Sequence, residues 1–179
     1  MTTGIDISEW QAPGSVNFGP YAFVIIRTSH GMTEDKAWRL HFNAAVAAGR
    51  SIGLYHYAEH NVPENEASFF HGLAGFLTPE QCRMGWWLDV EEGQDSTWAD
   101  RFRAWVHLPT IGVYSNLAGF NGPLRAYMHF GLNWLAWPSA PSVPAGYAVP
   151  DHILRQTGQA GGVDTDVMQP AQPMPLAWQ

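Results

Sequence analysis

The sequence is poor in cysteine and in basic residues, and it contains no long apolar run. Its single cysteine, Cys82, excludes an internal disulfide and any metal site built on two thiolates. Nine Lys and Arg side chains stand against sixteen acidic ones, which disfavours nucleic acid as a partner, because phosphate binding draws on clustered basic residues. No stretch of 18 apolar residues occurs, so we expect no membrane insertion.

The first ten residues, MTTGIDISEW, have neither a basic start nor an apolar centre, so we expect no signal peptide. The chain of 179 residues suits one domain, and a domain of that size buries roughly 70% of its unfolded surface. Nine Trp, six Tyr and nine Phe residues exceed what packing requires. Aromatic rings that are not needed in a core are suited to stacking on flat, semi-polar faces such as those of sugars.

Eight strand-like runs follow one another along the chain, with helical patterns between the middle ones. The runs are GIDISEW, YAFVIIRTS, IGLYHYA, MGWWLDVE, TIGVYSN, LNWLAWP, HILRQT and GVDTDVM. Between them, Pro63 is predicted to begin a helix with an apolar stripe of Phe69, Leu73 and Phe76, and Ser96 is predicted to cap a helix that carries Trp98, Phe102 and Trp105. This order predicts a closed, parallel-type α/β barrel over residues 1–168 and a Pro/Gln-rich tail over 169–179.

The segment HYAEH offers the spacing of a zinc motif in His56, Glu59 and His60. That motif requires a helix, which places both histidines on one face. The alternating run IGLYHYA predicts a strand instead, in which the two histidines would be about 13 Å apart. We therefore expect no metal at this segment.

Acids follow the apolar run GWWLDVEEG. In a strand Asp89 and Glu91 point to the same side, about 6.5–7 Å apart at their Cα atoms, at the barrel mouth where active sites are built. For this pair alone, a solvated strand end is the commoner explanation. Asp6 and Asp164 change that balance, because they lie on the first and last strands and could meet where the barrel closes. Such a cluster suits a hard metal ion or a carboxylate glycosidase, and the abundant aromatic residues favour sugar.

Seven segments in this order, GIDISEWQ, FVIIRTSHG, GLYHYA, WWLDVEE, IGVYSN, LNWLAWP and GGVDTDV, resemble the glycoside hydrolase family 25 muramidases, the Chalaropsis-type lysozymes that include many bacteriophage endolysins. The resemblance covers nearly all of residues 4–168. It implies an irregular TIM-like barrel of five β/α units followed by three strands. The implied activity is a lysozyme that cleaves the β-1,4 bond between N-acetylmuramic acid and N-acetylglucosamine in bacterial peptidoglycan.

The resemblance also implies roles for single residues. Glu91 matches the catalytic acid, Asp89 its partner in the D-x-E motif, and Asp6 and Asp164 the acids of the first and last strands. Substrate-facing rings are implied at Tyr57, Tyr114 and Trp134. Asp166 stands where related sequences often have asparagine, so it is given no catalytic role. No metal or cofactor is expected.

Together these features predict a monomeric, retaining, acetamido-assisted muramidase with an antimicrobial, wall-lysing role. Without a signal peptide, it would be made in a host cytoplasm and reach the cell wall after release, as a phage endolysin does. Two alternatives stay open. One is a catalytically weak sugar-binding or structural module of a phage particle on the same barrel. The other is a different barrel glycosidase such as a chitinase, which the tryptophans ahead of Asp89 disfavour.

Overall fold

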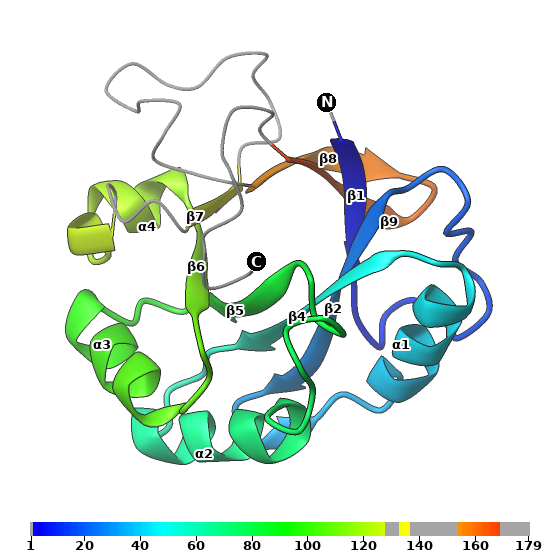
Figure 1. Cartoon of the computed structure of the whole chain (residues 1–179). Coiled ribbons are helices and arrows are strands. Elements are labelled where there is room, and N and C mark those ends of the chain that lie inside the picture. Colours follow the sequence, from blue (N-terminus) through cyan, green and yellow to red (C-terminus); the bar gives the residue numbers. More distant parts are fainter. Residues whose placement is uncertain (1, 128–132, 137–153, 169–179) are drawn as a thin grey trace.

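The computed structural model describes residues 2–127, 133–136 and 154–168. The described residues form nine strands, four α-helices and one 3-10 helix (Figure 1). In chain order they are β1 (Thr2–Ile7), β2 (Phe23–His30), β3 (Thr33–Glu34), α1 (Trp38–Ala47), β4 (Ser51–Tyr57), α2 (Pro63–Ala74), β5 (Gly85–Asp89), α3 (Ser96–Trp105), β6 (Ile111–Asn116), α4 (Leu117–Asn121), η1 (Arg125–Tyr127), β7 (Asn133–Ala136), β8 (Leu154–Ala160) and β9 (Val163–Met168). The predicted tail, residues 169–179, lies outside the described residues.

Eight of these strands close into a barrel. The order is β1-β9-β8-β7-β6-β5-β4-β2, and β1 pairs with β2 to complete the ring. Neighbouring strands are parallel from β1 through β2 to β8, whereas β9 is antiparallel to both β8 and β1. The short β3 pairs with β2 outside the ring. The predicted irregular α/β barrel is confirmed: among the described residues the last helices, α4 and η1, follow β6, and the strands β7, β8 and β9 come after them.

The helices cover only part of the barrel. Figure 1 shows α1 to α4 along the side formed by β2, β4, β5 and β6, whereas β1, β8 and β9 have no described helix against them. The connection from β1 to β2, residues 8–22, is described throughout and forms no helix. The first of the five β/α units therefore lacks its helix. None of the described helices is long and apolar enough to cross a membrane.

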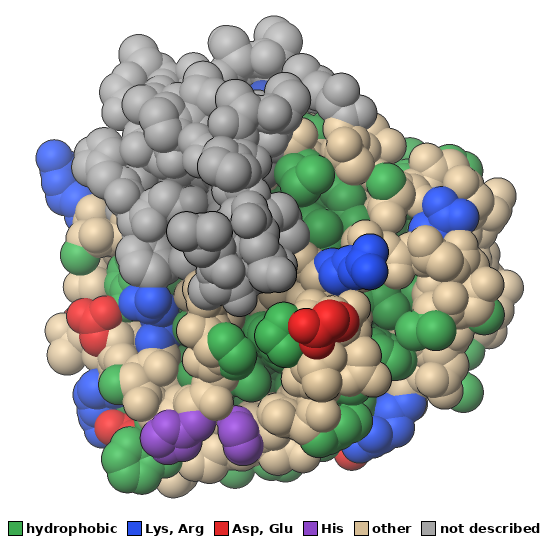
Figure 2. Space-filling view, viewed as in Figure 1, with side chains coloured by type: hydrophobic (Ala, Val, Ile, Leu, Met, Phe, Trp, Pro, Cys, Tyr) green, Lys and Arg blue, Asp and Glu red, His purple; other side chains and the backbone are tan. Residues whose placement is uncertain are grey.

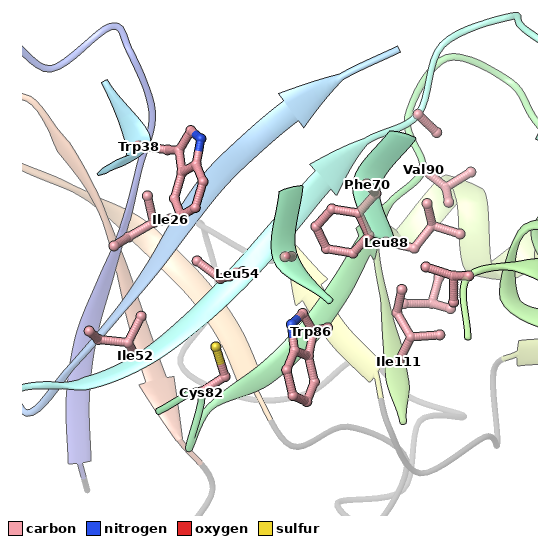
Figure 3. Close-up of a cluster of buried hydrophobic side chains, with 14 of the residues drawn as sticks. Ile26, Trp38, Ile52, Leu54, Phe70, Cys82, Trp86, Leu88, Val90 and Ile111 are labelled. Carbon is pink, nitrogen blue, oxygen red and sulfur yellow. The ribbon is translucent and has the colours of Figure 1, made fainter. Parts of the chain in front are cut away.

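Side chains alternate between two cores, as strand geometry requires. Outward-facing residues of the strands, among them Ile26, Leu54 and Leu88, pack against Trp38 of α1 and Phe70 of α2 (Figure 3). Inward-facing residues fill the lower barrel with a second, aromatic cluster that consists of Phe23, Ile25, Tyr55, Met84, Trp87, Tyr114, Trp134 and Leu154. This filled lumen supports whatever lies at the carboxyl ends of the strands.

The predicted apolar face of α2 is wrong by about one residue. Phe76 lies beyond the helix and is 62% exposed, whereas the buried residues of α2 are Pro63, Glu66, Ala67, Phe70 and Ala74. A glutamate occupies a core position because its carboxylate is saturated with donors. The carboxylate of Glu66 accepts from His56 Nε2 at 2.8 Å and from the backbone N–H groups of Glu59 and Asn61, each at 3.1 Å.

The α3 predictions also need correction. Its N-cap is Asp95 rather than Ser96, and the Asp95 carboxylate accepts the Trp98 N–H at 2.9 Å. Trp105, which we placed on the apolar face, is 51% exposed and donates its indole N–H to Ser68 Oγ. The buried residues of this helix are Ala99 and Phe102.

Candidate active site

All seven residues that the sequence singled out line one pocket at the carboxyl ends of the strands. The pocket of about 190 Å³ is lined by Asp6, Ile7, Ser8, Trp10, Gln11, Arg27, Tyr55, Tyr57, Asp89, Glu91, Tyr114, Trp134, Gln156 and Asp164. A larger cavity of about 450 Å³, between α1 and residues 80–83, lies at the opposite end of the strands. The acidic pocket is the candidate active site because carboxyl groups of three strands converge there.

Strand β5 delivers Asp89 into this pocket. Trp87 packs in the lumen below it, while Leu88 and Val90 lie in the outer core, as alternation predicts. Two backbone hydrogen bonds fix the end of the strand: Ala58 N–H donates to the Asp89 carbonyl at 2.8 Å, and Val90 N–H donates to the Tyr114 carbonyl at 3.0 Å. The Asp89 carboxyl is therefore held in register with β4 and β6.

The Asp89 carboxyl is buried, and its Oδ1 has no hydrogen-bond partner among the described residues. Burial raises the pKa of Asp89 well above its ordinary value, and the negative charges of Glu91 and Asp6 raise it further, while Arg27 acts in the opposite direction. An unpartnered buried carboxyl oxygen is costly unless a ligand supplies a donor. Asp89 is thus suited to accept an N–H or O–H from a bound molecule.

Glu91 lies two residues further along, just beyond β5, with its side chain exposed at the rim of the pocket. Partial desolvation between the pocket walls raises the pKa of Glu91, and the charges of Glu92 and Asp164 add to the effect. A carboxyl with a raised pKa keeps its proton at higher pH and can donate it.

Asp6 and Asp164 are directly opposed across the antiparallel β1–β9 pair that closes the barrel. Burial raises the pKa of Asp6 to about 7; a hydrogen bond from Gln156 lowers it, and the charge of Asp164 raises it. Gln156 Nε2 donates to Asp6 Oδ2 at 3.0 Å. The closure of the barrel therefore brings residues from the two ends of the domain into one site.

Sequence reasoning missed Gln156, Arg27 and the part played by Asp166. The amide of Gln156 bridges two predicted residues, since its Oε1 accepts the Tyr114 hydroxyl at 3.0 Å while its Nε2 donates to Asp6. Asp166 is fully buried, and its Oδ1 accepts the Trp134 indole N–H at 2.8 Å. Alternation in GVDTDV carried a signal for Asp166, because it shares a strand face with Asp164.

The three predicted rings differ in what they offer a ligand. Tyr57 is half-buried, and its hydroxyl donates to Glu92 Oε1 at 2.6 Å. Tyr114 and Trp134 are 6% and 1% exposed, with ring centroids 4.6 Å apart. They form the floor of the pocket, and because both rings are buried, little of either ring is available to stack on a sugar.

The HYAEH segment is extended in its first half, since His56 and Tyr57 end β4. His56 is buried between Ser29 Oγ and Glu66 Oε2, at 2.8 Å from each, and stacks on Phe102. Glu59 binds His30, and His60 is an exposed neighbour of Glu92. The three side chains of the motif thus have different partners. Within the described ranges, no group of three or more His, Cys, Asp or Glu side chains could hold a metal ion.

The described surface shows no continuous basic area on the face in Figure 2, where basic, acidic and histidine side chains form small separate groups. This distribution agrees with the small number of Lys and Arg residues.

Comparisons with known proteins find lysozymes, muramidases and endolysins. An autolytic lysozyme of Clostridium acetobutylicum is 35% identical over 95 residues, an alignment that covers 49% of this chain and 28% of that protein. A muramidase from Trichobolus zukalii superposes with a TM-score of 0.78 at 22% identity, covering 96% of this chain and 95% of its own, which is a likeness of fold. The catalytic domain of endolysin ply40 from bacteriophage P40 of Listeria monocytogenes has a TM-score of 0.71 at 26% identity, with 95% and 94% covered.

The family model described as Glycosyl hydrolases family 25 matches residues 5–109, more than half of the chain. The match contains Asp6, Asp89 and Glu91, and the closing strand β9 supplies Asp164 beyond it. The chain belongs to family 25 of the glycosyl hydrolases.

Proposed function

We propose that this chain is a muramidase that hydrolyses the β-1,4 bond between N-acetylmuramic acid and N-acetylglucosamine in bacterial peptidoglycan. The observation that carries the proposal is the convergence of Asp89, Glu91 and the opposed Asp6–Asp164 pair on one pocket. Family membership and the names of the relatives, a lysozyme and a muramidase, support the choice of substrate.

Glu91 is the proposed general acid. It stands at the open rim, where a leaving-group oxygen can approach, and its raised pKa favours the protonated form that the first step needs. Protonation of the bridging oxygen lets the bond break with positive charge developing on the sugar ring.

Asp89 is proposed to act on the 2-acetamido group of the muramic acid rather than as a nucleophile. It ends β5 and Glu91 follows two residues later, so both carboxyls approach the sugar from one side, whereas a nucleophile should oppose the acid. The acetamido carbonyl oxygen can attack the anomeric carbon itself, while the free Oδ1 of Asp89 accepts the acetamido N–H and stabilises the positive charge that develops there. This attack closes a ring between the acetamido oxygen and the anomeric carbon. Water then opens that ring at the anomeric carbon, and the β-configuration is retained.

Asp6 and Asp164 are proposed to position Asp89 and the incoming water. Asp6 is held by Gln156, and its charge acts on Asp89 across the lumen. Buried support of this kind keeps reacting groups in a productive geometry.

Purified protein incubated with peptidoglycan tests the proposal. Release of fragments with muramic acid at the new reducing end, identified by mass spectrometry, is expected. Glucosamine at that end would make the protein a different glycosidase, and binding without cleavage would favour a sugar-binding module. An endolysin role, which the likeness to ply40 supports, further predicts lysis of bacteria when the protein is added from outside.

A further inference from the structure

Trp10 is the most exposed large apolar side chain among the described residues, at 81%, and it stands at the edge of the candidate active site. It also lines a second cavity of about 400 Å³, roughly twice the volume of the catalytic pocket. The two cavities share Trp10 and Gln11 as their common wall. An indole at this place is positioned to contact a ligand that extends from one cavity into the other.

The backbone that carries Trp10 is fixed although the ring is exposed. Glu9 N–H donates to Asp35 Oδ2 at 2.8 Å, Gln11 N–H donates to the Ser8 carbonyl at 3.1 Å, and the Gln11 carbonyl is bonded to His41 Nε2 at 3.0 Å. These hydrogen bonds hold the backbone on both sides of Trp10 without covering the ring. Only the side-chain torsions of Trp10 then have to be ordered when a ligand stacks on it, which keeps the entropic cost of binding small.

The second cavity, here called the β1–β9 groove, exists where the barrel lacks a helix. One wall is the helix-free connection from β1 to β2, and the other is the turn between β8 and β9 (Figure 1). Gln11 Nε2 donates to the Gly162 carbonyl at 3.1 Å and ties the two walls together. The lining is Trp10, Gln11, Ala12, Ser15, Val16, Asn17, Pro20, Tyr21, Ala160, Gly161, Gly162 and Val163.

The chemistry of this lining selects among the parts of peptidoglycan. It contains two aromatic rings, two amides, two hydroxyls, small aliphatic side chains and backbone groups, and none of its residues carries a charge. Flat, neutral, hydroxyl-rich rings suit such a surface, whereas the charged stem peptides would find no ion partner in it.

We propose that Trp10 and the β1–β9 groove form a further glycan subsite, which holds the polysaccharide strand beyond the sugars at the catalytic acids. The strand passes from the catalytic pocket across the indole and into the groove. This inference rests on the proposed muramidase function for the identity of the polymer, but its test measures binding and does not require cleavage.

The test uses the Glu91→Gln protein, so that ligands stay intact, and isothermal titration with peptide-free soluble glycan strands of two lengths. Trp10→Ala in this background is expected to weaken binding of strands of eight sugars about tenfold, the effect of one stacking contact, and to weaken disaccharide binding much less, because Trp10 lies only at the edge of the catalytic pocket. Trp10→Phe should restore most of the affinity. Trp105→Ala removes a second exposed tryptophan, which lies on α3 and lines neither cavity, and should change neither affinity.

The other outcomes contradict either this inference or the muramidase proposal. Equal weakening for both lengths would place Trp10 in the catalytic pocket alone, and no weakening, or no binding of long strands, would exclude a subsite. Weakening seen only with strands that carry stem peptides would assign the groove to peptide. Wild-type protein that binds long strands through Trp10 but releases no fragments would instead refute the muramidase proposal and leave the subsite standing.

Discussion

At the scale of single residues, the site places two carboxyl groups with raised pKa values, Asp89 and Glu91, at the carboxyl end of β5. Asp89 is buried with a free oxygen, and Glu91 is exposed at the rim. Different environments for two neighbouring acids are the usual basis for dividing their roles in catalysis.

Glu91→Gln is expected to lower the rate of peptidoglycan cleavage by about 10²–10⁴-fold, because the amide has no proton to give to the leaving oxygen. The side chain is exposed, so thermal melting should not change. Glu80→Gln, which changes an exposed acid at the opposite end of the strands, serves as the matched control. A Glu91→Gln rate within a few-fold of wild type would remove Glu91 from the reaction.

The pH dependence of peptidoglycan cleavage should report the ionisation of Asp89. Its pKa is raised in the free protein, and an acetamido N–H donated to Oδ1 should lower it again. On the acidic side, activity should therefore fall at a lower pH for kcat, which reports the enzyme–substrate complex, than for kcat/KM, which reports the free enzyme.

Asp89→Asn should be severely impaired at every pH. With the wild-type protein, proton NMR should show a β-anomer as the first product. An initial α-anomer, or a sugar ester trapped on Asp89, contradicts the acetamido route.

At the scale of elements, the strands were easier to predict than the faces of the helices. A strand alternates with a period of two, so placing Trp87 in the lumen also fixes Asp89 there and turns Leu88 outward. The face of α2 depends on Glu66, whose core position results from donors on β4 and the following loop. Nothing in the local sequence identifies those donors, so the apolar stripe alone gave the wrong phase.

The junction of β1 and β2 depends on the small size of Gly4. A Cβ atom added there would overlap the ring of Phe23, which is buried in the lumen floor. Gly4→Ala should therefore lower the free energy of unfolding by about 1–3 kcal/mol, the usual cost of overpacking. Gly72→Ala on α2, where an added Cβ meets nothing within 4 Å, should be neutral or stabilising. Urea denaturation of both variants checks this, and equal midpoints would show that the floor can relax.

At the scale of the whole molecule, the buried acids that build the site work against its stability. The chain has a net charge of −7, and three buried carboxyls, Asp6, Asp89 and Asp166, all have raised pKa values. Burial by segments far apart in the sequence raises these pKa values most, and neighbouring acids add to it. The sequence alone therefore singled out Asp6 and Asp89 but gave no measure of their burial.

Asp6→Asn should alter how stability depends on pH. The pKa of Asp6 is about 7 when folded and about 3.9 in an unfolded chain, so its protonation stabilises the fold fully below pH ~4, and this contribution is lost as pH rises to about 7. Asparagine does not titrate. Relative to wild type, the variant should gain roughly 2–4 kcal/mol of unfolding free energy between pH 4 and pH 7. Chemical denaturation at several pH values measures the gain, which the exposed control Glu80→Gln should not show; a constant difference would mean that Asp6 titrates normally.

The closing strand also has a consequence for biosynthesis. Among the strands of the barrel, β1 is translated first, yet its neighbour β9, which carries the acid opposite Asp6, is translated last. Until Met168 has emerged, β1 and β8 have open edges, and the pocket lacks Asp164 and the strand that buries Asp6. Contacts between such distant segments form late and slowly. The nascent chain therefore lacks the complete set of proposed catalytic acids, and we expect hydrolytic competence to arise in one late step, after the whole barrel has been translated.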